Sequence, residues 1–258
     1  MKRLKAALVQ AELRWQDPQA NRAHLSELMD RSPGADLYVL PETFTTGFLG
    51  DAGRGAEEFD GPTLAWMRTE SRRRSAAVAG SVALTDADGL RRNRMVFMPP
   101  DGDPGWYDKR HLFSFGGEDE RYTAGAAHTV VSWRGWRIDL QICYDLRFPV
   151  WCRNDRDFDL QLFVANWPSP RVEAWRLLLQ ARAVENQAFV IGVNCCGRLG
   201  NGNAYSGRSV ALDGAGERLL ELGSQETVDT VTLDREALQS LRKKLPFLQD
   251  RDQFRLEN

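Results

Sequence analysis

The sequence predicts an α/β fold in which two β-sheets pack face to face with helices on the outside. The chain opens with a strand, a helix and a second strand, and this order is typical of a sheet covered by helices. About a dozen strand-like segments follow, and a sheet of that many strands rarely stays single and flat. No linker or internal repeat interrupts the 258 residues, so a single domain is expected, with a core at about residues 4–235 and a C-terminal helix and tail at 234–258.

In the first half of the chain, apolar runs alternate with helix signals. Asp17-Pro18 is a suitable N-cap and first-turn pair, and apolar residues then recur at helical spacing up to Met29. Gly61-Pro62-Thr63 opens a second helix that ends before Ser75. Small residues in the third expected strand let a helix pack closely. The strands of this half are expected at residues 4–9, 35–40, 76–84, 91–98 and 105–109.

In the second half, a hairpin over residues 129–142 leads directly into Cys143, and a short helical stretch is expected at 150–153. Asp234 caps a final helix to about residue 244, and the tail from Pro246 is expected to lie on the surface or on a partner subunit. The best helix pattern covers residues 173–187, with Leu177, Leu178, Ala181, Val184 and Glu185 in register. Further strands are expected at residues 160–165, 188–193, 209–212, 218–222 and 227–233, with a Gly/Asn-rich loop at 194–207.

Composition excludes several classes of protein. A net charge of −2 with 27% charged residues gives no reason to expect nucleic acid or an anionic membrane as partner. No apolar run approaches the roughly 18 residues of a membrane span. The basic start is followed by an apolar run too short for a secretion signal, so a cytoplasmic protein is expected. Four cysteines and three histidines, without a CxxC pattern, predict neither a disulfide framework nor a metal site.

Three chemically complementary residues, Glu42, Lys109 and Cys143, stand where strands end. In α/β folds, side chains at the carboxyl ends of strands line the ligand crevice. A nearby carboxylate can take the proton of a thiol, and an ammonium group can stabilise the thiolate. The ammonium and a backbone N–H can also bind the oxyanion that forms when a thiol attacks an amide. The three residues together therefore indicate acyl transfer.

Each of these residues also has a structural interpretation. An unpaired cysteine such as Cys143 is often only a small buried hydrophobe. Glu42 is equally suited to capping a turn or pairing with a surface cation, and Lys109 to being an exposed cation. His111 is either a hydrogen-bonded structural residue or the activating base of a papain-like Cys-His hydrolase. Spacing alone does not bring the side chains together.

The segments that carry these residues resemble the Glu, Lys and Cys motifs of the nitrilase (carbon–nitrogen hydrolase) superfamily, and most closely its ω-amidase branch. The resembling motifs are residues 41–44, 107–113 and 142–149, with further shared segments at 181–190 and 205–209. The resemblance implies a four-layer α-β-β-α sandwich, a homodimer and no metal or organic cofactor. It also implies hydrolysis of the terminal amide of 2-oxoglutaramate or 2-oxosuccinamate to the keto acid and ammonia. The alternative is another activity of the superfamily: aliphatic amidase, N-carbamoyl hydrolase or nitrilase.

Carried over by motif, Glu42 is the general base, Lys109 supports the oxyanion and Cys143 is the nucleophile. The backbone N–H of Tyr144 is the second oxyanion donor. The family's second glutamate falls best on Glu118, with Glu120 as the competing position, where it would orient Lys109.

A keto acid substrate carries a carboxylate, which needs a cation in a desolvated pocket. Arg147 and Arg171 are the candidates, although Arg147 is equally suited to packing or to pairing with Asp145. Three aromatic residues are expected to form pocket walls, and each is equally suited to the core: Phe48, Phe115 and Trp167.

Overall fold

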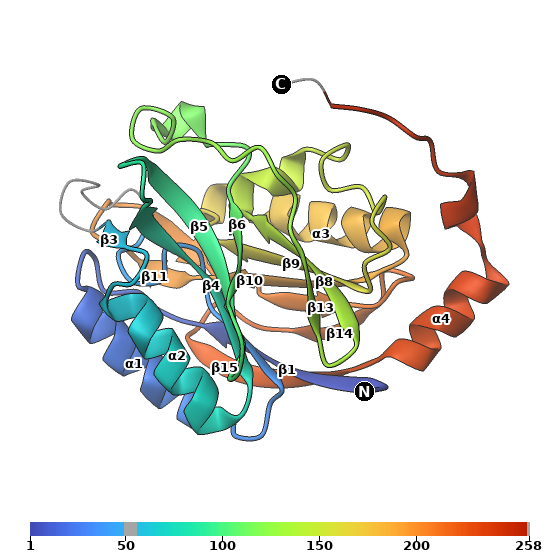
Figure 1. Cartoon of the computed structure of the whole chain (residues 1–258), viewed down its shortest axis with the longest axis horizontal. Coiled ribbons are helices and arrows are strands. Elements are labelled where there is room, and N and C mark those ends of the chain that lie inside the picture. Colours follow the sequence, from blue (N-terminus) through green and yellow to red (C-terminus); the bar gives the residue numbers. More distant parts are fainter. Residues whose placement is uncertain (49–55, 257–258) are drawn as a thin grey trace.

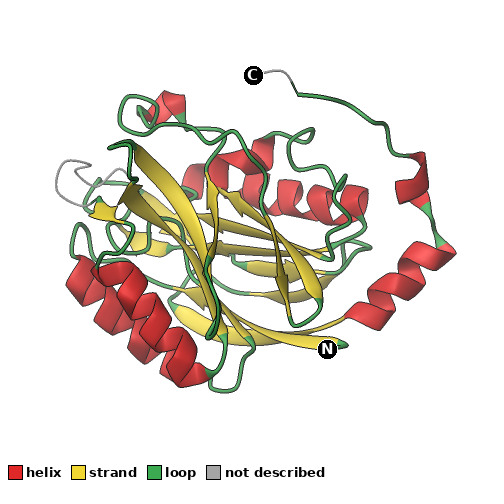
Figure 2. Ribbon diagram, in the orientation of Figure 1, coloured by secondary structure: helices red, strands yellow, loops and turns green. Residues whose placement is uncertain are grey.

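The computed structural model describes residues 1–48 and 56–256 of the chain. Two mixed β-sheets pack face to face at its centre, with helices on their outer sides (Figures 1 and 2). The predicted four-layer α-β-β-α sandwich is thereby confirmed.

The first sheet has the strand order β15-β1-β2-β4-β5-β6, and β3 pairs with β4. Strands β1, β2 and β4 run parallel, while β15, β5 and β6 join antiparallel. Figure 1 shows helices α1 (Pro18–Asp30) and α2 (Pro62–Arg74) side by side on its outer face. The strands are β1 (Arg3–Gln10), β2 (Leu37–Val39), β3 (Glu57–Glu58), β4 (Ala77–Thr85), β5 (Arg91–Met98), β6 (Gly105–Asp108) and β15 (Thr227–Asp234).

The second sheet has the order β14-β13-β10-β9-β8-β7, with a parallel centre formed by β8, β9 and β10. Helix α3 (Val172–Asn186) covers its outer face (Figure 1). The strands are β7 (Val130–Trp133), β8 (Trp136–Ile142), β9 (Leu160–Ala165), β10 (Phe189–Asn194), β13 (Val210–Leu212) and β14 (Arg218–Glu221).

Side chains point alternately to the two faces of a strand, so a single strand contributes to two hydrophobic cores. In β1, Leu4, Ala6 and Leu8 belong to the main core that includes both sheets, whereas Ala7 and Val9 pack in a second core with residues of α1 and α2. All five side chains are fully buried. One strand of the first sheet therefore packs against both the second sheet and the outer helices.

Two local predictions are wrong. The Gly/Asn-rich segment predicted as a loop contains a short hairpin, β11 (Cys196–Arg198) and β12 (Ala204–Ser206). Its pairing is supported from outside the segment, because the Cys196 N–H donates to the Ala11 carbonyl at 3.0 Å. The helical turn expected at residues 150–153 lies instead at Cys143–Arg147, a 3-10 helix (η2). Two further 3-10 turns are η1 (Ser114–Gly116) and η3 (Ser169–Arg171).

The buried face of α3 also differs from the predicted one. Leu177 and Val184 are 68% and 50% exposed, whereas Trp175, Leu179 and Ala183 are fully buried. The reason is a close approach to β10: a Cβ on Gly192 would lie 2.5 Å from Leu179 Cδ1 and 2.8 Å from Trp175 Cζ2. Because Gly192 has no side chain, Trp175 and Leu179 can pack against β10. The face of α3 that carries Leu177 and Val184 is therefore exposed to solvent.

The C-terminal segment leaves the first sheet after β15 through α4 (Arg235–Lys244). The Asp234 side chain accepts from the backbone N–H groups of Glu236 and Ala237, which confirms it as the N-cap. A 3-10 turn, η4 (Phe247–Asp250), follows, and Arg251 then donates to the Asn154 carbonyl at 2.8 Å. None of the helices in residues 1–48 and 56–256 is long and apolar enough to cross a bilayer.

Candidate active site

Glu42 lies just beyond β2 and is fully buried between the two sheets. Its segment passes directly over Gly80 of β4, where a Cβ would lie 2.8 Å from Phe44 Cδ1 and 2.9 Å from Leu40 Cβ. The next residue, Thr43, has a left-handed φ of 39°, and its N–H donates to Ser81 Oγ at 2.8 Å. Glycine in β4 and this hydrogen bond therefore fix the turn that carries the carboxylate.

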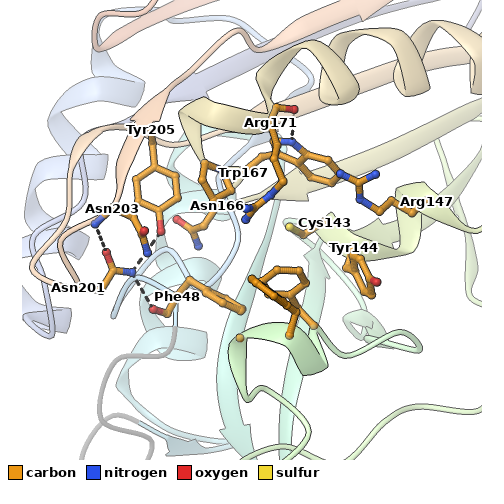
Figure 3. Close-up of a pocket in the computed structure, with 14 residues that line it drawn as sticks. Phe48, Cys143, Tyr144, Arg147, Asn166, Trp167, Arg171, Asn201, Asn203 and Tyr205 are labelled. Carbon is orange, nitrogen blue, oxygen red and sulfur yellow. Dashed lines mark hydrogen bonds between the residues drawn. The ribbon is translucent and has the colours of Figure 1, made fainter.

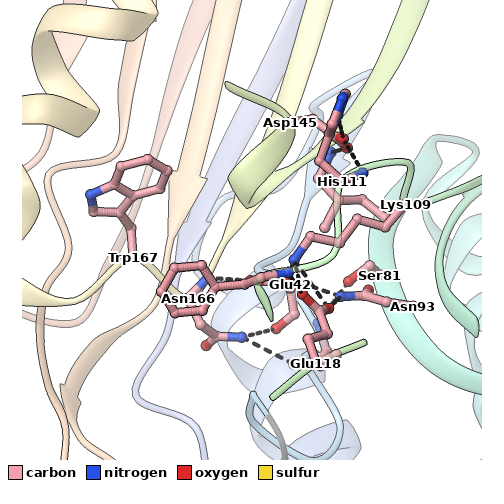
Figure 4. Close-up of polar contacts among 12 residues, drawn as sticks. Glu42, Ser81, Asn93, Lys109, His111, Glu118, Asp145, Asn166 and Trp167 are labelled. Carbon is pink, nitrogen blue, oxygen red and sulfur yellow. Dashed lines mark hydrogen bonds and ion pairs between the residues drawn. The ribbon is translucent and has the colours of Figure 1, made fainter. Parts of the chain in front are cut away.

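Lys109 follows β6 and is fully buried between two carboxylates (Figure 4). Its Nζ lies 2.8 Å from Glu42 Oε1 and 2.8 Å from Glu118 Oε2. Asn93 Nδ2 bridges the same two carboxylates, at 2.9 and 3.0 Å. The interpretation of Lys109 as an exposed cation is wrong. Of the two candidate glutamates, the structure brings Glu118 to the lysine, whereas Glu120 is exposed.

Cys143 stands directly after β8, at the first residue of η2. Its φ of 45° is left-handed, an unusual conformation for a residue with a side chain. The residue is 9% exposed, and the Glu42 carboxylate, whose Oε1 contacts Lys109, helps to raise the pKa of its thiol. The other oxygen of that carboxylate, Oε2, accepts from the Asn166 N–H at 2.8 Å, so Glu42 is held from both sheets.

Burial and charge together define the protonation of the site. Burial raises the pKa of the Cys143 thiol, the negative charge of Glu42 adds to this, and Lys109 acts in the opposite direction. Burial lowers the pKa of Lys109, but the charges of Glu118 and Glu42 more than offset it and raise this pKa well above its usual value. The resting site therefore holds a neutral thiol, a permanent ammonium and a carboxylate within reach of the thiol proton.

A cavity of about 280 Å³ opens onto Cys143 (Figure 3). Its lining includes every residue that was predicted to bind the substrate: Phe48, Phe115, Tyr144, Arg147, Trp167 and Arg171. Phe115 is 89% exposed and Trp167 only 3%, so the first lies at the rim and the second in the wall. The lining also includes residues that the sequence did not single out for the pocket: Phe113, Asn166, Asn201, Asn203 and Tyr205. Only Asn166, directly after β9, carried a recognisable strand-end signal.

The two arginines reach the cavity over aromatic rings. The Arg147 guanidinium lies 4.9 Å from the centre of the Trp167 ring, and that of Arg171 lies 5.4 Å from the centre of the Phe113 ring. Trp167 Nε1 also donates to the Arg171 carbonyl at 2.7 Å, which fixes the segment that carries this cation. The cavity lining contains these two cations and no acidic residue among the residues that the structure describes. Its outer part is therefore electropositive.

His111 is held in a structural network. Its Nδ1 lies 2.8 Å from Asp145 Oδ1, and its ring stacks on Phe148 with the ring centres 3.6 Å apart. It does not line the cavity with Cys143. The histidine therefore has the hydrogen-bonded role, and no papain-like Cys-His pair forms. Among the described residues there is also no group of three or more His, Cys, Asp or Glu side chains arranged to hold a metal ion.

A buried thiol beside a carboxylate and an ammonium, at the adjoining strand ends of an α-β-β-α sandwich, defines the class of thiol-dependent carbon–nitrogen hydrolases. The chain belongs to the carbon-nitrogen hydrolase family, whose model matches residues 5–243. It is an enzyme of the nitrilase superfamily that hydrolyses amides.

Individual relatives are similar over nearly their full length. An omega-amidase, YafV, from Yersinia enterocolitica is 47% identical over 99% of this chain and 100% of that protein. A 2-oxoglutaramate amidase from Bacillus subtilis is 33% identical over 85% of this chain and 86% of its own. Among solved structures, XC1258 from Xanthomonas campestris, a CN-hydrolase superfamily protein with an arsenic adduct in its active site, superposes with a TM-score of 0.97 at 48% identity, covering 100% of both chains.

Proposed function

We propose that this protein is an ω-amidase that cleaves the terminal amide of a small α-keto acid amide, 2-oxoglutaramate or 2-oxosuccinamate, to the keto acid and ammonia. The observation that carries the proposal is the cavity, in which the thiol of Cys143 and two arginine guanidiniums face the same small space. The names of the YafV and 2-oxoglutaramate amidase relatives support the same substrate class.

In the proposed reaction, Glu42 takes the thiol proton as the sulfur of Cys143 attacks the amide carbon. The oxyanion that forms is stabilised by the ammonium of Lys109 and the backbone N–H of Tyr144. Glu42 returns the proton to the departing nitrogen, so ammonia leaves and a thioester remains on the enzyme. Water then attacks the thioester with Glu42 again as base, which frees the keto acid and restores the thiol.

In this reaction Glu118 keeps Lys109 charged and oriented. It contributes two contacts to the ammonium, at 2.8 and 3.1 Å, and its Oε2 also accepts from the Phe113 N–H at 2.6 Å. Glu118 therefore holds the ammonium through a carboxylate that is itself fixed by the Phe113 N–H, while the other partner of the ammonium, Glu42, exchanges protons.

Arg147 and Arg171 are proposed to bind the substrate carboxylate. A guanidinium forms short, charge-assisted hydrogen bonds to a carboxylate, and aromatic walls strengthen them by excluding water. Phe48, Phe115 and Trp167 are proposed as those walls. The rest of the acyl chain of 2-oxoglutaramate has only a few atoms, so it suits a cavity of about 280 Å³.

The decisive experiment measures ammonia release from 2-oxoglutaramate, a simple aliphatic amide, an N-carbamoyl amino acid and a nitrile. We expect the keto acid amide to have the highest kcat/KM by a wide margin. Cys143→Ala should abolish turnover while the protein stays folded, and a thioester on Cys143 should be trapped by rapid quenching and mass spectrometry. A preference for any of the other three substrates would replace the proposed activity with the corresponding one of the superfamily.

The role of the arginines is tested separately. Arg171→Met and Arg147→Met should each raise KM for 2-oxoglutaramate about 10- to 100-fold, because a hydrogen bond to a charged group contributes roughly 1.5–3 kcal/mol. Hydrolysis of a neutral aliphatic amide serves as the internal control and should change little. Equal losses on both substrates would mean that the arginines support the fold instead.

We further propose that the whole chain works as a single carbon–nitrogen hydrolase domain and forms a homodimer in the cytoplasm. The outward apolar side chains of α3, Leu177 and Val184, support association with a second copy. The cytoplasmic location is supported by the four cysteines, all of which are free.

A further inference from the structure

Asp145 is a fully buried carboxylate that does not line the substrate cavity. Four donors converge on it. Oδ1 accepts from the backbone N–H of His111 at 2.9 Å and contacts His111 Nδ1 at 2.8 Å. Oδ2 accepts from the Tyr107 hydroxyl at 2.8 Å and from the Ile142 N–H at 3.1 Å. Figure 4 shows Asp145 and His111 above Lys109 in this view.

The positions of these donors along the chain are informative. Ile142 immediately precedes Cys143, whereas Tyr107 and His111 stand two residues before and two residues after Lys109. One carboxylate therefore connects the turn that carries the nucleophile, which leaves the second sheet, to the turn that carries the ammonium, which leaves the first sheet.

The backbone at Cys143 needs such a connection. Its left-handed φ of 45° is unfavourable for a residue with a Cβ and persists only where surrounding contacts enforce it. The contact from Asp145 to the Ile142 N–H closes this turn from within η2. Beyond the same carboxylate, the Tyr107 hydroxyl also accepts from the Arg110 N–H at 3.1 Å and from Trp151 Nε1 at 3.0 Å, so the lysine turn is held at several points.

We propose that Asp145 is a positioning residue that sets the distance and orientation between the Cys143 thiol and the Lys109 ammonium. The proposal rests on the proposed function only in that both assign the chemistry to these two groups. Asp145 touches neither the substrate cavity nor the reacting atoms, and it acts through the two turns that it joins.

A carboxylate is required for this role because each of its oxygens accepts two donors. In Asp145→Asn one carboxylate oxygen is replaced by an NH₂ group. This NH₂ group would face either the two N–H donors of His111 or the Tyr107 hydroxyl and the Ile142 N–H. One of the two turns is then released while the side-chain volume stays the same. The substitution therefore tests position with little change in packing.

The first experiment compares Asp145→Asn with Asp139→Asn, a matched change at another fully buried carboxyl, six residues earlier, on β8, that has no contact with the lysine turn. We expect Asp145→Asn to lower kcat on 2-oxoglutaramate about 100-fold with KM changed by no more than about threefold, because a misplacement of about 1 Å costs that much. Asp139→Asn should keep the wild-type kcat. Rates are expressed per active site, titrated by alkylation of Cys143.

The second readout needs no substrate. The rate of Cys143 alkylation by iodoacetamide is measured against pH in both variants. Because Lys109 lowers the pKa of the thiol, moving the ammonium away should shift the alkylation profile of Asp145→Asn to higher pH. A lower melting temperature with an unchanged kcat per active site and an unchanged alkylation profile would overturn the proposal, because a merely structural anchor behaves that way.

Two further measurements distinguish a failure of this proposal from a failure of the proposed function. Tyr107→Phe removes one donor and leaves the carboxylate, so kcat should fall about tenfold alone and little further in the Asp145→Asn background, since residues that act through one network are not additive. If Asp145→Asn does not fold, an unchanged kcat in Tyr107→Phe overturns the proposal. A wild-type enzyme that is alkylated but releases no ammonia from 2-oxoglutaramate would contradict the proposed function alone, and the alkylation profiles would still decide the role of Asp145.

Discussion

At the residue scale, the site depends on one ammonium group shared between two carboxylates in the interior. Lys109, Glu42 and Glu118 are all fully buried, so each charge has lost its hydration and is stabilised only by its partners. Attraction between buried charges balances this loss of hydration when the pairing is complete. The removal of one member then leaves an uncompensated charge in the interior. The catalytic machinery is therefore also a stability determinant.

This coupling predicts the outcome of a double-mutant cycle. Lys109→Met should lower the free energy of unfolding by about 3–5 kcal/mol, because two carboxylates remain buried without a cation. Glu118→Gln in the same background should recover part of the loss, since only one carboxylate then remains. Urea unfolding measures both. Lys2→Met, which removes an exposed lysine paired with Glu236, is the control and should leave the unfolding midpoint unchanged. Additive losses would contradict the shared ammonium.

Another buried carboxyl, Asp139 on β8, has no cation as a hydrogen-bond partner and differs in its protonation. It accepts from Gln141 Nε2 at 2.8 Å and from Gln161 Nε2 at 2.9 Å. Its Oδ1 and the Oε1 of Gln141 have no hydrogen-bond partner in the part of the chain that the structure describes. Burial raises the pKa of Asp139 to about 7, whereas an unfolded chain has the ordinary low value. Below about pH 7 the folded protein therefore favours the neutral acid.

The stability of the protein should therefore fall as Asp139 ionises. Because the pKa is higher in the folded state, the contribution of Asp139 is fully present below about pH 4 and is lost as the pH rises through about 7. Relative to Asp139→Asn, the wild-type free energy of unfolding should drop by roughly 4 kcal/mol over this range, the equivalent of a shift of about three pKa units. Denaturant unfolding of both proteins from pH 4 to 8 gives the difference. Parallel curves would show that Asp139 is ionised in the folded state.

At the scale of elements, the catalytic turns lie at the ends of strands, and they are held by contacts with neighbouring strands. The turn after β2 lies against Gly80 and Ser81 of β4, and the turn after β8 is joined to the one after β6 through Asp145. In this way the strands supply rigidity, and the residues just beyond them are free to adopt left-handed backbone at Thr43 and Cys143. The position of Glu42 therefore depends on the side-chain volume available on β4.

Gly80→Ala tests this dependence. The new methyl group would meet Phe44 and Leu40 at 2.8–2.9 Å, and it should displace the Glu42 turn. We expect a loss of about 1–3 kcal/mol in the free energy of unfolding, as for other overpacked sites, together with a clear fall in kcat. Gly223→Ala is the matched control, because a Cβ there meets nothing within 4 Å and the backbone has no left-handed φ. Thermal unfolding and ammonia release in both variants measure the two effects.

At the scale of the whole molecule, the unusual feature is the outward face of α3. Its inner face fills the main core, yet Leu177 and Val184 remain half or more exposed, and Phe247 and Phe254 of the C-terminal segment are also exposed, at 59% and 42%. Exposed apolar patches on a folded protein commonly mark contact surfaces. This supports the proposed association of two copies through the α3 side of the sandwich.

Leu177→Glu should therefore convert the dimer to a monomer, because a carboxylate cannot be buried in an apolar interface without a partner. Size-exclusion chromatography with light scattering gives the mass directly. Leu219→Glu, at another exposed leucine on β14, is the control and should stay dimeric. A wild-type monomer would refute the proposed homodimer outright, and a dimeric Leu177→Glu variant would place its interface elsewhere.

Most of the strand and helix order, the strand-end positions of Glu42, Lys109 and Cys143, and part of the pocket lining could be predicted from the linear sequence. Periodicity, capping residues and motifs are local properties, so they can be recognised in the sequence without knowledge of the fold. The choice between Glu118 and Glu120, the buried face of α3 and the pairing of β11 with β12 depended on packing. So did the anchoring of two catalytic turns by Asp145, whose partners Tyr107 and His111 lie more than 30 residues away. Such contacts form only when two sheets pack together, because the chain itself places no constraint on residues so far apart.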